Sequence, residues 1–258
     1  MGQLDGKIAV VTGGGRGIGR AIAQRFAEEG ADIVISSRTQ SDLDAVVGYA
    51  ESLGRTGVAV VADSTTKEGA QAPVLAALER FGRVDALVNN VGGTIGRHHD
   101  PFVDDPDGSF ERTLTFCLTS IYWTTQAALP AMRDAGGGRV ISIGSGASKH
   151  ASGTVAYTAA KHGLVGLTKQ LAAAAAPHGI NVNLLCPGWT NTSLVDWPSI
   201  AARRGVSIEE AQATAFADAL QHRILEAEEL SGMAVLLCAA DGRGITGQVI
   251  SVDGGYKI

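Results

Sequence analysis

Tyr157 and Lys161 are the residues of this 258-residue chain whose types and spacing most directly suggest chemistry. They stand four positions apart in the stretch YTAAK, so in a helix both side chains project from one face. A free tyrosine is a poor base at neutral pH, but a neighbouring ammonium favours its phenolate form. Such a phenol can take a proton from an alcohol or give one to a ketone. Ser145 ends a predicted strand before this helix, and its hydroxyl can hydrogen-bond the substrate oxygen.

Each of these three residues also has an ordinary structural interpretation. A tyrosine and a lysine at this spacing are common on a solvated helix face. A serine at a strand end is usually a turn residue. Whether they do chemistry therefore depends on whether other parts of the chain place a cofactor beside them.

The stretch TGGGRGIG, residues 12–19, lies between an apolar strand and a helical pattern. Glycines let the chain turn tightly and leave no Cβ between the backbone and a phosphate. The N-terminus of the following helix offers unpaired N–H groups and a partial positive charge to a pyrophosphate. A glycine-rich turn without a ligand is the alternative. The strand before the loop and the helix after it favour dinucleotide binding.

The second predicted strand ends in the letters ISSRTQ. In dinucleotide-binding folds an acidic residue at this end binds the ribose 2′-hydroxyl of NAD, whereas an arginine accommodates the 2′-phosphate of NADP. Ser37 occupies the place of the acid, Arg38 follows it, and Arg16 of the glycine loop is expected at the same edge of the cofactor. Both arginines could instead be solvated surface charges. We predict NADP(H) as the cofactor in preference to NAD.

The composition excludes several classes of partner. The net charge of −5 and the pI near 5.7 argue against a nucleic-acid or membrane-surface partner, which would need a basic face. No apolar run reaches the roughly 18 residues that a membrane helix needs, and the N-terminus lacks the features of a signal peptide. The three cysteines have no ligand spacing, which predicts a reduced, cytoplasmic protein without a metal site or disulfide framework.

Short apolar runs separated by amphipathic or alanine-rich stretches predict the strands of a parallel sheet that is buried on both faces. The runs are 7–13, 32–37, 57–63, 84–90, 138–144, 180–186 and 247–254, and the helical stretches are 17–30, 67–82, about 109–134, 155–178 and 226–240. Repeated strand–helix units predict an α/β, Rossmann-type doubly wound fold, with a seven-stranded mostly parallel sheet and helices on both faces. We expect one dinucleotide-binding and catalytic domain over residues 1–258, with a substrate-lid insertion at about 189–222.

The glycine spacing TGxxxGxG, formed by Thr12, Gly13, Gly17 and Gly19, resembles that of the short-chain dehydrogenase/reductase family. Further matches follow in the family's order: Asp63, NNVG at 89–92, Ser145, YTAAK at 157–161 and PGWTNT at 187–192. The resemblance extends from about residue 5 to the VDGG near the C-terminus.

The resemblance implies a role for each matched residue. Tyr157 would be the general acid and base, Lys161 would bind the cofactor ribose and favour the phenolate, and Ser145 would hold the substrate oxygen. Asp63 would face the adenine, and residues 187–192 would hold the nicotinamide amide. The predicted cofactor-binding residues are Gly13, Arg16, Gly17, Ile18, Gly19, Ser37, Arg38, Asp63, Asn90, Tyr157, Lys161, Pro187, Gly188, Thr190 and Thr192. Family members commonly associate through alanine-rich helices such as residues 171–179, which implies a homotetramer.

The resemblance also implies the reaction. It indicates an NADP(H)-dependent oxidoreductase that transfers hydride between the nicotinamide and a small-molecule ketone or secondary alcohol, most similar to 3-oxoacyl reductases. NNVGGTI at 89–95 is similar to NAD-dependent cis-dihydrodiol dehydrogenases of aromatic degradation, which usually carry an acid where this chain has Ser37. The alternative of another class is a catalytically weak cofactor-binding sensor or scaffold.

Two regions are expected to line the substrate, namely the loop 92–105 and the insertion. The apolar candidates of the insertion are Trp189, Leu194, Trp197, Ile200 and Phe216, some of which could instead pack the insertion against its own body. Arg97, His98 and His99 could meet a substrate carboxylate, although such a trio is commonly a solvated loop.

Cys117, in the stretch LTFCLTS, falls where the family usually has an asparagine that helps hold a water joining the lysine to solvent. A thiol is a weak donor and acceptor and cannot replace that amide. Phe110, Leu114, Cys117 and Ile121 recur at helical spacing, so the cysteine could also be a small buried apolar residue. Our hypothesis is that Cys117 lies buried near the site, is no nucleophile, and leaves the relay to a backbone carbonyl and water.

Overall fold

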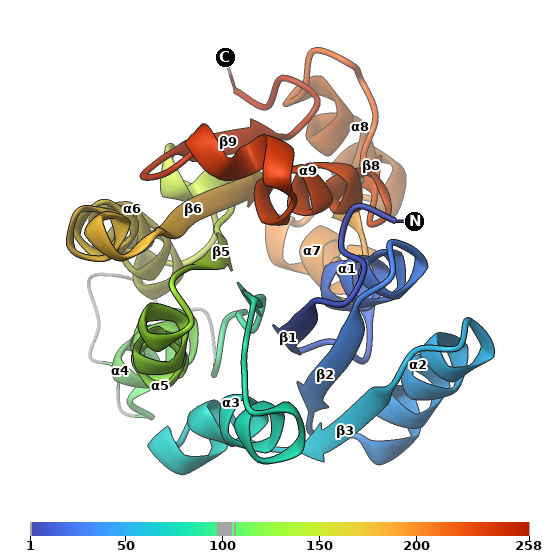
Figure 1. Cartoon of the computed structure of the whole chain (residues 1–258). Helices are drawn as coiled ribbons and strands as arrows, with labels where there is room; N and C mark the ends of the chain where they lie inside the picture. The colour runs from blue at the N-terminus through green and yellow to red at the C-terminus, as the bar shows by residue number, and fades with distance from the viewer. Residues whose placement is uncertain (1, 97–104, 106, 258) are drawn as a thin grey trace.

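A seven-stranded parallel sheet with helices on both faces forms the body of the protein (Figure 1). The computed structural model describes residues 2–96, 105 and 107–257. The strands are β1 Ile8–Thr12, β2 Asp32–Ser37, β3 Gly57–Val61, β4 Ala86–Asn89, β5 Gly138–Ile143, β6 Ile180–Pro187 and β9 Val249–Val252. They are arranged in the order β3-β2-β1-β4-β5-β6-β9, and each neighbouring pair is parallel. The predicted Rossmann-type fold is confirmed.

The strands bury both of their faces against helices. Successive side chains of a strand point to opposite faces, so in β1 Ala9 and Val11 join one core and Ile8 and Val10 join the other. Helices α1 Gly17–Glu28, α2 Gln40–Ser52 and α9 Glu229–Cys238 cover the first face, and α3 Lys67–Phe81, α5 Ser120–Asp134 and α6 Val155–Ala175 cover the second. None of the helices in the described ranges is long and apolar enough to cross a membrane.

The strand order reverses between β1 and β4, which creates the crevice where open α/β sheets bind ligands. In register, Thr12 of β1 pairs with Ser36 of β2, and Val11 pairs with Val88 of β4. The glycine loop after β1 therefore lies between the end of β2 and the end of β4. Residues distant in sequence meet at this carboxyl edge of the sheet.

Several elements differ from the sequence prediction. Helix α2 was not predicted, although Leu43, Val46 and Ala50 form its buried stripe, because serine, glycine and aspartate residues weaken the apolar pattern. The predicted helix 109–134 is divided into α4 Ser109–Leu114, a π-helical turn Thr115–Thr119 and α5. The last helix begins at Glu229 instead of 226, because Leu225–Glu226 form the short strand β8.

The insertion between β6 and β9 contains its own small elements, β7 Thr190–Asn191, α7 Trp197–Arg204 and α8 Ile208–Ala217. Strands β7 and β8 pair in parallel as a separate two-stranded sheet, which joins the two ends of the insertion. Ile200, Ala201 and Ala211 form a separate small core with Trp189 and Trp197 packed against it. The insertion is therefore held at its base and has its own apolar packing.

Candidate active site

The glycine loop after β1 has a shape that depends on two of its glycines. Gly13 has a φ of +64°, in the left-handed region that favours glycine. A Cβ on Gly19, in the first turn of α1, would lie 2.3 Å from the carbonyl oxygen of Gly13. The Asn90 amide donates to the carbonyl oxygens of Thr12 and Gly13, at 3.1 Å each. The loop is thus fixed between the end of β4 and the N-terminus of α1, where a pyrophosphate would be favoured.

One cleft follows the carboxyl edge of the sheet past this loop. Of the residues predicted for the site, it brings together Gly13, Arg16, Gly17, Ile18, Ser37, Arg38, Asp63, Asn90, Ser145, Tyr157, Lys161, Pro187, Thr190 and Thr192. Gly19 does not line it, because it packs beneath the loop, and Gly188 lines the neighbouring pocket. A cleft of this extent with a glycine floor fits a dinucleotide, since the loop has no Cβ to keep a phosphate away.

Charged side chains gather where the cleft passes β2 and β3. Arg16 and Arg38 are exposed and line it together with Ser37. The Ser37 hydroxyl donates to the Thr39 carbonyl oxygen at 3.0 Å and accepts from the Thr39 N–H at 3.2 Å. Hydrogen bonds from the backbone and hydroxyl of Thr65, with the nearby charge of Arg38, lower the pKa of Asp63. Two guanidinium groups are therefore exposed at this end.

Asp42 is a carboxylate at the same end that the sequence reasoning missed. It lies in the first turn of α2 and lines the cleft. A Cβ built on Gly15 would lie 2.9 Å from the Cβ of Asp42 and 3.2 Å from the Ser37 hydroxyl oxygen. The expectation that no carboxylate stands beside Ser37 was therefore wrong, because Asp42 reaches this position from the next helix. Recognising that a helix starts directly after ISSRT would have revealed Asp42, because the first turn of that helix lies against the glycine loop.

Tyr157 and Lys161 lie on the first turns of α6. Thr154 caps this helix, its hydroxyl oxygen accepting from the Tyr157 N–H at 3.0 Å. Lys161 is 3% exposed, and its Nζ donates to the Ile143 carbonyl oxygen at 2.8 Å and lies 5.5 Å from the centre of the Tyr157 ring. A buried ammonium costs free energy unless something compensates it, and among the described residues Lys161 forms no ion pair. This cation can stabilise negative charge on the neighbouring phenol.

Ser145 follows β5 and faces the same part of the cleft. Its hydroxyl oxygen accepts from the Ala147 N–H at 3.1 Å, and its own N–H donates to the Ser148 hydroxyl at 3.2 Å. Within the described ranges its hydroxyl hydrogen is given to no acceptor. Ser145 and Tyr157 line both the cleft and the adjoining pocket. An oxygen bound at this junction could accept from the serine and exchange a proton with the tyrosine.

A family model described as enoyl-(acyl-carrier-protein) reductase matches residues 13–257, and relatives over nearly the whole chain are named dehydrogenases or reductases. The chain belongs to the short-chain dehydrogenase/reductase family. It is therefore an oxidoreductase that acts on CH–OH groups. The sequence-based predictions of family and reaction class are confirmed.

Individual relatives show the extent of the likeness. The 2,3-dihydroxy-2,3-dihydro-p-cumate dehydrogenase of Pseudomonas putida is 36% identical over 259 residues, covering 98% of this chain and 95% of the relative. Carveol dehydrogenase from Mycobacterium avium, solved in complex with NAD, has a TM-score of 0.91 at 28% identity and covers 99% of each chain. A protein from Beutenbergia cavernae described as an NAD(P)-dependent gluconate 5-dehydrogenase, with bound NADP, has a TM-score of 0.86 at 35% identity, covering 98% of this chain and 97% of the other.

In this short-chain dehydrogenase/reductase Cys117 lies in the π-helical turn between α4 and α5. It is fully buried, and its Sγ accepts from the Gly93 N–H at 3.2 Å and donates to the Gly93 carbonyl oxygen at 3.1 Å. A Cβ on Gly92 would lie 3.2 Å from Lys161 Nζ and 3.7 Å from Cys117 Sγ. Cys117 therefore lies beside the lysine, as hypothesised, with its sulfur bonded to the segment that follows β4.

Cys117→Ala is expected to retain kcat within about threefold of the wild type, because the thiol contacts backbone and transfers no proton. Loss of its two backbone contacts should lower the free energy of unfolding by about 1–3 kcal/mol. Steady-state kinetics and thermal unfolding would measure the two effects. Cys238→Ala, which truncates the buried cysteine at the C-terminal end of α9, is the matched control. A loss of kcat as large as that of Tyr157→Phe would contradict the hypothesis.

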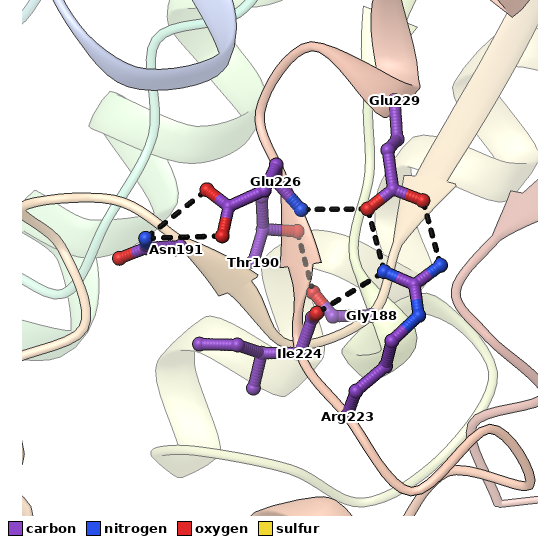
Figure 2. Close-up of polar contacts among 7 residues, drawn as sticks. All are labelled: Gly188, Thr190, Asn191, Arg223, Ile224, Glu226 and Glu229. Carbon is purple, nitrogen blue, oxygen red and sulfur yellow. Dashed lines mark hydrogen bonds and ion pairs between the residues drawn. The ribbon is translucent and has the colours of Figure 1, made fainter.

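A polar cluster joins the two ends of the insertion (Figure 2). Arg223 donates through both terminal nitrogens to Glu229 at 2.7 Å each, which lowers the pKa of Glu229 to about 2. The Glu226 N–H donates to the same carboxylate at 2.8 Å, while the Glu226 side chain accepts from the Asn191 amide at 3.0 Å. These bonds link β7 to β8 and α9. They hold strand β7 in place, and Thr190 of this strand lines the cleft.

A second pocket adjoins the cleft on the far side of Tyr157. Of the predicted apolar residues, Trp189, Leu194 and Ile200 line it. Trp197 instead stacks on Trp189, with ring centres 5.8 Å apart, and Phe216 is not among its lining residues. Arg97, His98 and His99 lie outside the described residues. The pocket also contains Tyr256, which the sequence reasoning missed because no local pattern indicates that the C-terminal segment returns to residues 146–152, between β5 and α6.

Proposed function

We propose that this protein is an NADP(H)-dependent oxidoreductase that transfers hydride between the nicotinamide and a ketone or secondary alcohol. The buried ammonium of Lys161 beside the Tyr157 ring is the observation that carries the proposal. Burying a lysine that has no carboxylate partner among the described residues costs free energy, so its position beside Tyr157 supports a role in the reaction. The bound cofactor would supply or accept the hydride, and the chain's own residues would manage the substrate oxygen and its proton.

Each of the three residues has a role that its contacts support. Ser145 has a hydroxyl hydrogen to donate to the substrate oxygen, which would orient the reacting carbon. Tyr157 would give a proton to that oxygen in reduction, or remove one in oxidation. Lys161 would bind the cofactor ribose and stabilise the phenolate, while Ile143 holds its ammonium in place. The presence of all three in one cleft argues against a sensor or scaffold that has lost the reaction.

The preference for NADP rests on Arg16 and Arg38 at the far end of the cleft. Their guanidinium groups are exposed and could pair with a 2′-phosphate in charge-assisted hydrogen bonds. Asp42 opposes this preference, since a carboxylate at this edge would repel a phosphate or accept from a ribose hydroxyl.

The alternative function is an NAD-dependent cis-dihydrodiol dehydrogenase. Asp42 and the similarity to the p-cumate dihydrodiol enzyme favour it. Arg16 and Arg38 both line this end of the cleft beside Ser37, and they lead us to retain NADP(H) as the proposal.

We further propose one catalytic domain that acts in the cytoplasm as a homotetramer. An apolar groove between α5 and α6, lined by Leu129, Pro130, Leu171 and Ile180, supports association between copies. The exposed small residue Ala174 on α6 would allow close approach of a second copy.

A spectrophotometric assay tests the proposed function. Purified protein would be supplied with NADPH or NADH and a panel of ketones and 3-oxoacyl thioesters, and with NADP or NAD and a panel of cyclic diols. We expect reduction of at least one ketone with a higher kcat/KM for NADPH. Turnover of diols alone with NAD would favour the alternative, and no hydride transfer in any combination would contradict both.

A further inference from the structure

The pocket beyond Tyr157 is lined by polar, apolar and positively charged side chains. Ser145 and Tyr157 form the end that adjoins the cofactor cleft. Trp189 and Ile200 supply apolar wall to the same pocket. Arg203 and Arg204, both exposed residues in the last turn of α7, also line it. A substrate with its oxygen at Tyr157 would therefore extend along apolar side chains toward two guanidinium groups.

The packing of α7 explains why these arginines meet the pocket. Ile200 and Ala201 are buried in the small core of the insertion, so this side of the helix is fixed against its neighbours. Asp196, Ser199 and Arg203 follow at intervals of three and four residues and form a neighbouring stripe, which lines the pocket. The stripe sets the direction of Arg203, and Arg204 lies four residues after the pocket-lining Ile200, on the same side of the helix.

The local charges favour an anion. Asp196 is the acid among the lining residues, and its carboxylate is occupied as the helix cap, accepting from the Ser199 N–H at 3.2 Å and hydroxyl at 2.5 Å. Those bonds and the charge of Arg203 lower the pKa of Asp196. Arg204 forms no ion pair with the residues that the structure describes. In a chain of net charge −5, two arginines beside one satisfied acid form a positive subsite.

We propose that Arg203 and Arg204 bind a carboxylate of the substrate, so that the substrate is a hydroxy acid or an oxo acid. This inference rests on the proposed function, because it places the reacting carbon at Tyr157. Guanidinium groups match a carboxylate geometrically and bind it through paired hydrogen bonds. Trp189, Leu194 and Ile200 would cover the carbon chain between the two ends.

Paired substrates test the assignment. The wild-type protein would be assayed with 2-, 3- and 4-oxo acids and with the methyl ester of each, which keeps the carbonyl and removes the charge. We expect kcat/KM for the best acid to exceed that for its ester by at least about tenfold, mainly through KM, as a charge-assisted pair would give. An ester used as well as its acid would overturn the inference while leaving the proposed function intact.

The double substitution Arg203→Gln with Arg204→Gln tests the residues themselves. It should lower kcat/KM for the acid by at least about tenfold and leave that for the ester within about twofold. Arg80→Gln is the matched control, because Arg80 is also a basic residue in the last turn of a helix. Equal losses for acid and ester would show a structural role and overturn the assignment. Calorimetry can also measure binding of the acid to the NADP-loaded protein, even without turnover. Loss of binding in the double variant would support the assignment of the two arginines. Unchanged binding would contradict that assignment.

Discussion

Replacing Tyr157 by phenylalanine is expected to reduce kcat by a factor on the order of 10³. The change removes one oxygen from a side chain on the first turn of α6 and leaves the ring beside Lys161. Without the phenol no group at this position can give a proton to the substrate oxygen or take one from it. The ring and the Thr154 cap both remain, so the fold and the cleft should persist.

Cofactor binding separates this chemical effect from a structural one. NADPH affinity, measured by fluorescence titration, should stay within about twofold for Tyr157→Phe, because the ring is kept. Tyr122→Phe is the control, since Tyr122 is 42% exposed on α5 and away from the cleft. A Tyr157→Phe protein that retains a tenth or more of the wild-type kcat would overturn the proposed mechanism. Loss of NADPH binding would instead assign the tyrosine a binding role.

The double substitution Ser37→Asp with Arg38→Ala is expected to reverse the cofactor preference from NADP to NAD. It removes one guanidinium and places a carboxylate at the end of β2. This carboxylate would accept a hydrogen bond from a ribose hydroxyl and would repel a phosphate. The lost charge-assisted contact alone is worth about 1.5–3 kcal/mol, so the ratio of kcat/KM for NADP to that for NAD should fall by at least about tenfold, and the new carboxylate should lower it further. Steady-state kinetics with both cofactors measures this ratio.

Asp42→Asn provides the opposite test at the same edge. Removing this carboxylate should raise the ratio in favour of NADP, because the repulsion of a 2′-phosphate is lost. Asp44→Asn, which removes an exposed carboxylate on α2 that does not line the cleft, controls for the change in net charge. An unchanged ratio in the double variant would contradict the assignment of Ser37 and Arg38.

Local patterns predicted much of this protein correctly. The apolar runs marked the strands of the main sheet, because strands covered on both faces need continuous apolar residues. The spacing of Tyr157 and Lys161 placed both on one side of α6, since residues four apart in a helix are neighbours. The glycine loop was predictable because its strand, loop and helix follow each other directly in the sequence.

Contacts between distant segments could not be predicted in this way. Asp42 reaches the cofactor edge through a helix whose apolar stripe is weak in the sequence. Cys117 bonds to Gly93 because a π-helical turn and the segment after β4 meet beside Lys161. Arg203 and Arg204 line the pocket because the core of the insertion fixes the rotation of α7.

The sequence by itself determined the strands, the glycine loop and the spacing of Tyr157 and Lys161, because each depends on residues within a few positions of one another. Only the tertiary structure decided which acid stands near Ser37, what Cys117 contacts and which charges line the pocket beside Tyr157. Those features depend on the packing of elements that are far apart in the chain.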